Sequence, residues 1–380
     1  MVGKLLLILL ISLVILDAWV QAKGKKSQTT KRNHTMTLIP KTFRGQKIIS
    51  IPEIEWSTES PSSSSSSPSL SPQLALHENS TAEYLTGVLS TRVIPAAYAV
   101  TILIGIPSNA AILGTLGAQT KTFSAAILYF SLAVSDLLFL LTLIAKVLYH
   151  LNGNDWVFGE ALCKVVTACF YGNVYCSVHT LTCLSVKRYL AIVHPFTYKG
   201  LPKRSCAIWS VLTVWAVFFA GMVPEFLVRQ SYHLPQLGIT TCHDVLPLSD
   251  RSYSFLPYYK LCLTFAGFFL PFLVTVISYM SIIHQLNKSH HDWAYYIKTS
   301  TLVFVMFAVC FAPSNVISFI HYINLYTSRE EHFYIFYNVA VCLCSLHSCL
   351  DPFLLSLMSR STGSKRNYLT FKGKTLSISI

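Results

Sequence analysis

Residues 163–195 read CKVVTACFYGNVYCSVHTLTCLSVKRYLAIVHP, and this stretch decides the fold of the chain. No Asp, Glu, Lys or Arg lies between Lys164 and Lys187. At a rise of about 1.5 Å per helical residue, this gap is longer than a membrane hydrocarbon core of about 30 Å. A helix this long and apolar belongs in a membrane. Its ends differ in chemistry, because the thiol of Cys163 stands at one end and a cluster of bases and aromatic residues before Pro195 stands at the other.

The composition of the whole chain indicates a membrane protein with several spans. Of its 380 residues, 53% are hydrophobic and only 12% are charged, whereas a soluble domain carries about 25% charged residues. The net charge of +13 would suggest a nucleic-acid partner in a soluble protein. Here the bases mostly flank apolar segments, where they set orientation, so we expect no nucleic-acid partner.

Seven apolar segments are each long enough to cross a bilayer as a helix. They are residues 93–116, 124–148, 163–193, 205–227, 258–283, 297–320 and 333–357. The connecting segments alternate, with most bases on the expected inner side and more acids than bases on the outer side. The sequence therefore predicts an all-α membrane protein, a seven-helix bundle over 93–357. A short cytoplasmic tail is expected over 358–380, with the N-terminus outside the cell.

The chain before the bundle divides into two parts. Residues 1–22 have the charge, apolar core and small-residue cleavage site of a signal peptide, although a short first transmembrane helix is the alternative. Residues 23–92 form a polar, serine-rich stretch that predicts a disordered extracellular tail. Asn33 and Asn79 each begin an N-glycosylation sequon, which is consistent with an exported tail.

Two stretches of this tail suit a protease. In the stretch from Leu38 to Gly45, an aliphatic pair and a proline precede Lys41, which is what a trypsin-like enzyme recognises. Downstream, acidic and apolar residues alternate, which suits docking to a basic protease surface. The docking residues are Glu53, Ile54, Glu55 and Trp56. The alternative is a solvated tail that contains lysines by chance.

Two cysteines fall at the expected outer face of the bundle, Cys163 at the start of the third segment and Cys242 in the second outer loop. Because that side is oxidising, we expect these two cysteines to form a disulfide.

Landmarks in all seven segments resemble the rhodopsin-like G-protein-coupled receptors. They are Asn109 in segment one, Asp136 in segment two, Arg188-Tyr189 in segment three, Trp215 in segment four, Pro271 in segment five, Phe311-Ala312-Pro313 in segment six and Asp351-Pro352 in segment seven. The run Cys242-His243-Asp244-Val245 is similar to a signature of the proteinase-activated (thrombin) receptors. The resemblance implies a multi-pass plasma-membrane receptor that couples to a heterotrimeric G protein.

The resemblance also implies an activation chemistry. A thrombin-like serine protease would cut between Lys41 and Thr42, and the new N-terminus, Thr42-Phe43-Arg44-Gly45, would act as a tethered ligand. A ligand held near its site has an effective concentration of about millimolar, so weak contacts suffice. His243 and Asp244 are expected to receive the ligand, with Asp244 pairing with its arginine or its new ammonium. The alternative is that Asp244 only orders the loop.

Three polar residues at membrane depth are the second expected site. Asn109, Asp136 and Asp351 would form a sodium- or water-filled site, since buried polar groups in a membrane are usually functional. A plain hydrogen bond between helices is the alternative. We expect no catalytic residues, no other metal and no cofactor.

The expected G-protein face is formed by Arg188 and Tyr189, and here the chain departs from the family pattern. Lys187 replaces the acid that normally precedes the arginine, and Leu355 replaces a tyrosine of segment seven. These departures favour a second hypothesis besides the self-sufficient receptor. In it, the chain is a cofactor that presents the protease or the cleaved peptide to a sibling receptor, with which it would form a heterodimer.

Overall fold

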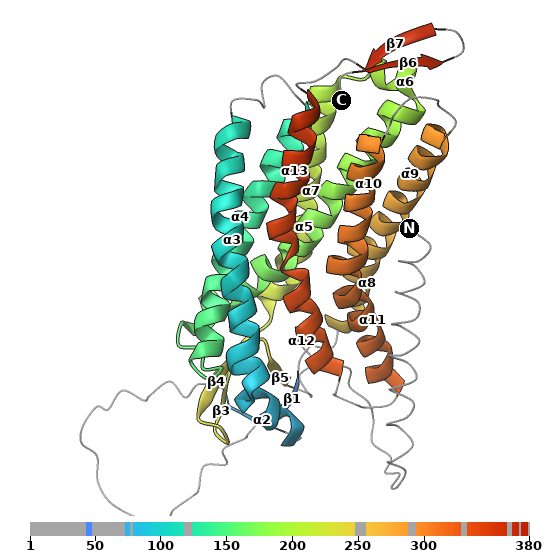
Figure 1. Ribbon diagram of the computed structural model, residues 1–380. Helices are drawn as coiled ribbons and strands as arrows, with labels where there is room; N and C mark the ends of the chain where they lie inside the picture. The colour runs from blue at the N-terminus through green and yellow to red at the C-terminus, as the bar shows by residue number, and fades with distance from the viewer. Residues whose placement is uncertain are drawn as a thin grey trace, which may run out of the picture. The chain divides into compact units, whose positions relative to one another are not determined.

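The computed structural model describes residues 43–47, 73–76, 79–117, 124–247, 256–287, 294–327, 333–362, 367–371 and 374–378. All of them belong to the unit that spans residues 38–380. Among these residues, seven helical segments are long and apolar enough to cross a membrane. They are residues 81–117, 124–151, 159–193, 203–227, 259–287, 300–320 and 335–354. The predicted all-α, seven-helix fold is confirmed (Figure 1).

Three spans are single α-helices and four are interrupted. The single helices are α4 (Ser124–Leu151), α5 (Gly159–Val193) and α7 (Lys203–Leu227). The first span combines α2 (Asn79–Thr86), a π-helical turn η1 (Leu89–Val93) and α3 (Ile94–Gly117). The later spans are α8 (Leu256–Thr264), η3 (Phe265–Phe269) and α9 (Leu270–Asn287); α10 (Ala294–Met306), η4 (Phe307–Phe311) and α11 (Ala312–Thr327); and α12 (Phe333–Cys344) with α13 (His347–Thr362). A short helix, α6 (Pro195–Gly200), follows α5.

Each of the three π-helical turns among the described residues stands shortly before a proline. The turn η1 ends two residues before Pro95, η3 two residues before Pro271, and η4 two residues before Pro313. A proline lacks the N–H that would bond the preceding turn, so the backbone there takes up a wider turn. Pro352, inside α13, follows the break between α12 and α13. The prolines of segments five, six and seven thus all lie at or near departures from regular helix.

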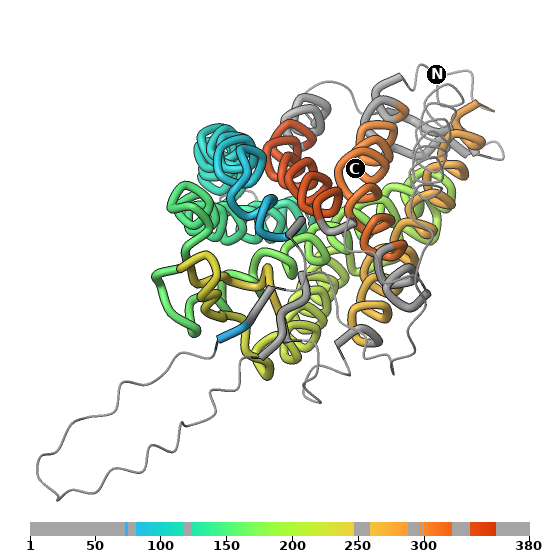
Figure 2. The backbone as a smooth tube through the Cα atoms, turned by 90° about the horizontal axis from the view of Figure 1, so that it is seen from below, coloured from blue at the N-terminus to red at the C-terminus, as the bar shows by residue number. Residues whose placement is uncertain are grey.

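Helix α5 is the element around which the others pack, as the view along the bundle in Figure 2 helps to follow. It contacts α4, α7 and α9 along its length. The approach to α7 is close at Gly172, where an added Cβ would lie 2.3 Å from the Phe218 ring. Buried side chains of α4, α5 and the later spans then form two apolar clusters, one toward each end of the bundle. The charge-free stretch of α5 is therefore the centre of the core.

Short strands cover one end of the bundle (Figure 1). Strands β3 (Ser231–Leu234) and β4 (Ile239–Cys242) form an antiparallel hairpin. A separate sheet has the order β2-β1-β5, from β2 (Leu74–Leu76), β1 (Phe43–Lys47) and β5 (Val245–Pro247). In that sheet β1 runs antiparallel to β2 and parallel to β5. At the other end of the chain, β6 (Asn367–Phe371) pairs with β7 (Lys374–Ile378).

The first span begins earlier than the sequence predicts. The first span starts at residue 81 rather than 93, and Leu74, Tyr84 and Leu85 are buried in the core. The tail expected over residues 23–92 therefore contains residues that pack. The reason is tertiary: Asn154, in the loop after α4, donates a hydrogen bond to the Leu85 carbonyl at 2.5 Å and so satisfies the end of α2.

Candidate functional site

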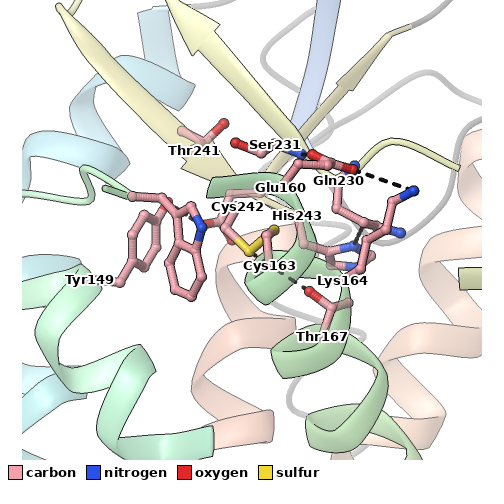
Figure 3. The surroundings of a disulfide bond; sticks show 12 residues. Tyr149, Glu160, Cys163, Lys164, Thr167, Gln230, Ser231, Thr241, Cys242 and His243 are labelled. Carbon is pink, nitrogen blue, oxygen red and sulfur yellow. Dashed lines mark hydrogen bonds and ion pairs between the residues drawn. A yellow bond between two sulfur atoms is a disulfide. The ribbon is translucent and has the colours of Figure 1, made fainter. Parts of the chain in front are cut away.

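The disulfide expected from the sequence is present and ties the second outer loop to α5. Cys163 lies in the first turns of α5 and Cys242 ends β4, and both are fully buried (Figure 3). Tyr149, Trp156 and Val166 pack around the bond. The Thr167 hydroxyl lies 3.8 Å from the Cys242 sulfur. The disulfide therefore holds the loop residues directly after Cys242 next to α5.

Polar clamps hold the hairpin β3–β4 at the same place. The carboxylate of Glu160 accepts hydrogen bonds from the backbone N–H groups of Gln230 and Ser231, both at 2.8 Å. On the other strand, the Thr240 N–H donates to Asp155 at 2.7 Å. These two acids stand at the start of α5 and in the loop before it, so the hairpin is fixed at both of its edges.

A turn at His243 aims the next residue into the bundle. His243 has φ of +69°, a left-handed backbone conformation that few residues adopt without local support. The support comes from Gln230, whose carbonyl accepts from the His243 N–H at 2.8 Å and whose amide oxygen accepts from Nδ1 at 2.5 Å. The imidazole also lies against the Tyr171 ring, with centroids 5.2 Å apart. This sharp turn ends β4 and starts β5.

Asp244 is buried between the loop and the outer ends of the helices. The Tyr149 hydroxyl donates a hydrogen bond to Asp244 Oδ2 at 2.5 Å. Lys146, one turn earlier in α4, is also buried, with its ammonium over the Tyr149 and Phe170 rings at 5.6 and 5.8 Å. Lys146 and Asp244 both line one cavity of about 20 Å³, which has room for about one water. An acid and a base therefore both line one small cavity beneath the loop.

A buried ion pair continues from His243 toward α8. Gln230 donates to the carboxylate of Glu225 at 3.1 Å, and Glu225 pairs with Lys260. The Lys260 ammonium lies over the Tyr171 ring at 5.4 Å. Because both charges are buried, each depends on the other for its stability. This chain of contacts connects the loop to the span that contains η3.

Strand β1 brings the expected ligand segment beside this loop. In the parallel register Phe43 lies opposite Val245, Arg44 opposite Leu246 and Gly45 opposite Pro247. The segment Phe43–Gly45 therefore pairs, through its backbone, with the residues that directly follow Asp244. The remaining tail predictions lie outside the described residues: Asn33, Lys41, Thr42, Glu53, Ile54, Glu55 and Trp56. Asn79 is the first residue of α2.

Mid-bundle, two of the three residues expected at a cation site come together, with an imidazole that the sequence analysis missed. One ligand atom each of Asp136, His347 and Asp351 lies within 4.8 Å of the others. Within the residues that the structure describes, none of the four carboxylate oxygens of Asp136 and Asp351 has a hydrogen-bond partner. The nearest imidazole nitrogen, His347 Nε2, lies 3.6 Å from Asp136 Oδ1. Asn109 is nearby in α3 and donates to the Ser348 carbonyl at 2.8 Å. Buried carboxylates without donors fit a hard cation such as sodium.

At the inner end of α5, the two adjacent bases Lys187 and Arg188 both donate to hydroxyl groups of α4. Arg188 is buried and donates to the Tyr129 hydroxyl at 3.0 Å. Lys187 donates to the Ser124 hydroxyl at 2.9 Å. The Tyr189 hydroxyl lies 3.0 Å from His194 Nε2. Hydroxyl groups of α4 thus take the place of a carboxylate on these two bases.

Charges inside the predicted spans are the signal that the sequence analysis passed over. Lys146, Glu225 and Lys260 each stand near the outer end of an apolar segment, and all three are buried. An ionisable residue within a span is by default a candidate functional residue. His347 could have been found in the same way.

Comparison with known proteins agrees with this architecture. The family described as "7 transmembrane receptor (rhodopsin family)" matches residues 109–355. The chain is 48% identical to proteinase-activated receptor 3 of Homo sapiens over 293 residues, which cover 77% of this chain and 78% of the relative. It is 39% identical to proteinase-activated receptor 2 of Mus musculus, over 73% of this chain and 71% of the relative. It is 34% identical to proteinase-activated receptor 1 of Xenopus laevis, over 92% and 86%.

The seven-helix bundle, the loop disulfide and the family match define a rhodopsin-family seven-transmembrane receptor, a multi-pass plasma-membrane protein. Within that class, the chain belongs to the proteinase-activated receptors. Its relatives are receptors rather than enzymes, and the rhodopsin family signals through G proteins.

Proposed function

We propose that a thrombin-like serine protease activates this receptor by cutting between Lys41 and Thr42, which exposes Thr42-Phe43-Arg44-Gly45 as a tethered ligand. The observation that carries the proposal is the parallel pairing of β1 with β5. It sets the ligand segment directly beside Asp244 in the chain before any cut.

The new ammonium is the group that the cut adds. Because β1 and β5 are parallel, the residue before any β1 residue lies opposite the residue before its β5 partner. Phe43 lies opposite Val245. Continuing that register by one residue after the cut would set the ammonium of Thr42 opposite Asp244. An ion pair in this buried place would compete with the hydrogen bond from Tyr149 and reach the outer end of α4.

The signal then has a route to the helices. Tyr149 lies one turn after Lys146 in α4, and the Gln230–Glu225–Lys260 contacts lead from His243 to α8. The π-helical turns η3 and η4 stand next to Pro271 and Pro313, where helices bend most readily. In this proposal Arg188 and Tyr189 meet a heterotrimeric G protein at the inner end, and a cation held by Asp136 and Asp351, with Asn109 beside them, stabilises the resting bundle.

A specific observation favours a second function. Lys187 and Arg188 each donate a hydrogen bond to a hydroxyl group of α4, and Lys187 stands where the family pattern has an acid. A receptor with an altered inner switch but an intact outer site could act as a cofactor. It would bind the protease through Glu53, Ile54, Glu55 and Trp56, and present it to a sibling receptor in a heterodimer.

One experiment tests the cut and separates the two functions. Cells would express the chain with one epitope before Lys41 and another at the C-terminus, and loss of the first epitope and intracellular calcium would be followed after thrombin. Lys41→Ala is the control. Epitope loss with a calcium rise, both abolished by the control, supports the self-sufficient receptor.

Two other outcomes are informative. Epitope loss without calcium in cells that lack sibling receptors, with calcium restored when a sibling is co-expressed, supports the cofactor. Retention of the epitope at thrombin concentrations that cleave a control substrate would contradict the thrombin assignment, and other trypsin-like proteases would then be compared.

A further inference from the structure

A pocket at the end of the bundle opposite the disulfide takes no part in the proposed activation. Its volume is about 230 Å³, and it is lined by residues of α4, α5, α6 and α7 with the loop after α6. Cys163 lies in the first turns of α5, whereas the α5 residues that line the pocket, from Thr182 to Leu190, belong to its last turns. The pocket is therefore next to the G-protein end of the bundle but separate from the outer ligand site.

Two lysines give the pocket its charge. The Lys187 ammonium donates to Ser124, which satisfies one of its three N–H donors. The Lys203 ammonium lies 4.4 Å from the centroid of the Tyr198 ring. None of the lining residues is an acid. Two cations that converge without an acid between them repel one another, so an anion in the pocket would relieve that repulsion.

The surrounding sequence is poor in acids. The segments at this end are residues 117–124, 187–204, 287–298 and 355–380, and the only Asp or Glu among them is Asp292. The bases are many: Lys121, Lys187, Arg188, Lys199, Lys203, Arg204, Lys288, Lys298, Arg360, Lys365, Arg366, Lys372 and Lys374. Thirteen bases against one acid, Asp292, leave this end of the chain with few anions of its own, which favours an anion supplied from outside.

The other walls of the pocket are apolar. They include Leu128, Val186, Leu190, Leu201 and Ala207. On the same turns of α7, outside the pocket, Trp209 and Leu212 are exposed at 66% and 52% and face the region that lipid fills around a membrane helix. An occupant thus needs a negative group beside an apolar part.

We propose that this pocket binds the headgroup of an anionic phospholipid from the surrounding leaflet. The phosphate lies between Lys187 and Lys203, and the acyl chains run outward along α7. The pocket is smaller than the roughly 300 Å³ at which drug-sized sites begin, which suits a headgroup rather than a whole ligand. Basic pockets between helices at this membrane face are known lipid-headgroup sites. Lys187, which removes the family's acid–arginine contact, is then a lipid ligand.

The test uses the full-length receptor in nanodiscs of phosphatidylcholine that contain a minor fraction of phosphatidylserine. Native mass spectrometry would count the phosphatidylserine retained after release from the disc. The double variant Lys187→Gln/Lys203→Gln should retain about tenfold less than the unmodified receptor. Lys199→Gln is the matched control, because Lys199 is an exposed base of α6 that does not line the pocket. Its retention should change by less than twofold.

A measurement on the unmodified receptor guards against a variant that fails to fold. The thiol of Cys183 lines the pocket and is half-buried. Its alkylation, followed by peptide mass spectrometry, should slow about fivefold in phosphatidylserine discs relative to pure phosphatidylcholine. The exposed thiol of Cys262, outside the pocket, should react at one rate in both.

Three outcomes would overturn the proposal. Equal lipid retention by the double variant and Lys199→Gln, in protein with unchanged melting temperature, would show that the two lysines are not ligands. Protection of Cys183 by oleate equal to that by phosphatidylserine would assign the pocket to a free fatty acid. Protection by inorganic phosphate alone would assign it to a soluble anion.

Discussion

Asp244 is the residue on which the proposed activation depends, because it is buried, hydrogen-bonded to Tyr149 and adjacent to the strand that pairs with the ligand segment. Its role as an ion-pair partner and its role in ordering the loop predict different results. The first needs the negative charge, whereas the second needs only the hydrogen bond. Substitutions of Asp244 and of Tyr149 distinguish these two roles.

We expect Asp244→Asn to weaken binding of a soluble peptide that begins Thr-Phe-Arg-Gly by about tenfold, which corresponds to about 1.4 kcal/mol. Tyr149→Phe, which keeps the charge and removes the hydrogen bond, should have a smaller effect. Both would be measured by displacement of a labelled peptide on cells with matched surface expression. An N-acetylated peptide should not distinguish Asp244→Asn from the unmodified receptor. If it does, the ammonium is not the partner of Asp244.

The mid-bundle carboxylates predict a sodium effect. In sodium chloride the purified receptor should melt at a higher temperature than in choline chloride, because a cation that binds only the folded state stabilises it. Asp136→Asn should remove that difference, since it deletes one of the two buried carboxylates. Asp155→Asn, at the outer loop, is the control that should leave it in place. An equal sodium effect in Asp136→Asn and the unmodified receptor would contradict the site.

The sequence predicts some residues of the site and not others, depending on how far apart in the chain their contact partners lie. The cysteine pair and Asp244 could be predicted because their positions relative to the spans are enough to place them. His347 lies 3.1 Å from Asn173, 174 positions away, and that contact depends on how α5 and α13 are rotated about their axes. Hydropathy is insensitive to such rotations in segments that are apolar on all sides. The same holds for Lys146 and Tyr149.

At the scale of the elements, α5 and α7 approach each other very closely at Gly172. An added Cβ at Gly172 would lie 2.3 Å from Phe218 and 2.9 Å from the Met222 sulfur, so the ring and the thioether would have to move. We expect Gly172→Ala to destabilise the receptor by about 1–3 kcal/mol through overpacking. The measurement is the melting temperature of the solubilised full-length receptor.

Gly114 in α3 is the matched control, since an added Cβ there would meet nothing within 4 Å. Gly114→Ala should leave the melting temperature unchanged or raise it slightly, because alanine favours helix over glycine. An equal loss in both variants would mean that helix conformation, rather than the contact with α7, requires the glycines.

The elements themselves show where sequence prediction stops. The seven spans were predictable because each is long and apolar, a property of one segment alone. The start of the first span was not, since α2 is held by Asn154, whose amide donates to Leu85 from 69 positions away. The pairing of β1 with β5 was not predictable either. The segment Phe43–Lys47 has no alternation of apolar and polar residues, and its partner strand is only three residues long.

At the scale of the whole molecule, the disulfide joins residues 79 positions apart and anchors the outer loop to the central helix. We expect Cys163→Ser to lower stability by about 2–5 kcal/mol, the usual loss for a native disulfide. Surface display, measured with an antibody to an N-terminal tag at 37 °C, should fall sharply. Cys206→Ser, at an exposed free thiol, should change it little. Normal display and peptide binding by Cys163→Ser would contradict this role.

The central place of β1 between β2 and β5 has a consequence for drug discovery. A peptide or small molecule designed to imitate the proposed ligand segment would first have to displace a resident strand whose two edges are already paired. Screening against the intact receptor would therefore underestimate the potency of every such compound. Assays on a receptor variant that lacks β1 would rank such compounds by their affinity for the site itself. Antagonists that hold the resident strand in place, rather than replace it, would have no such competitor.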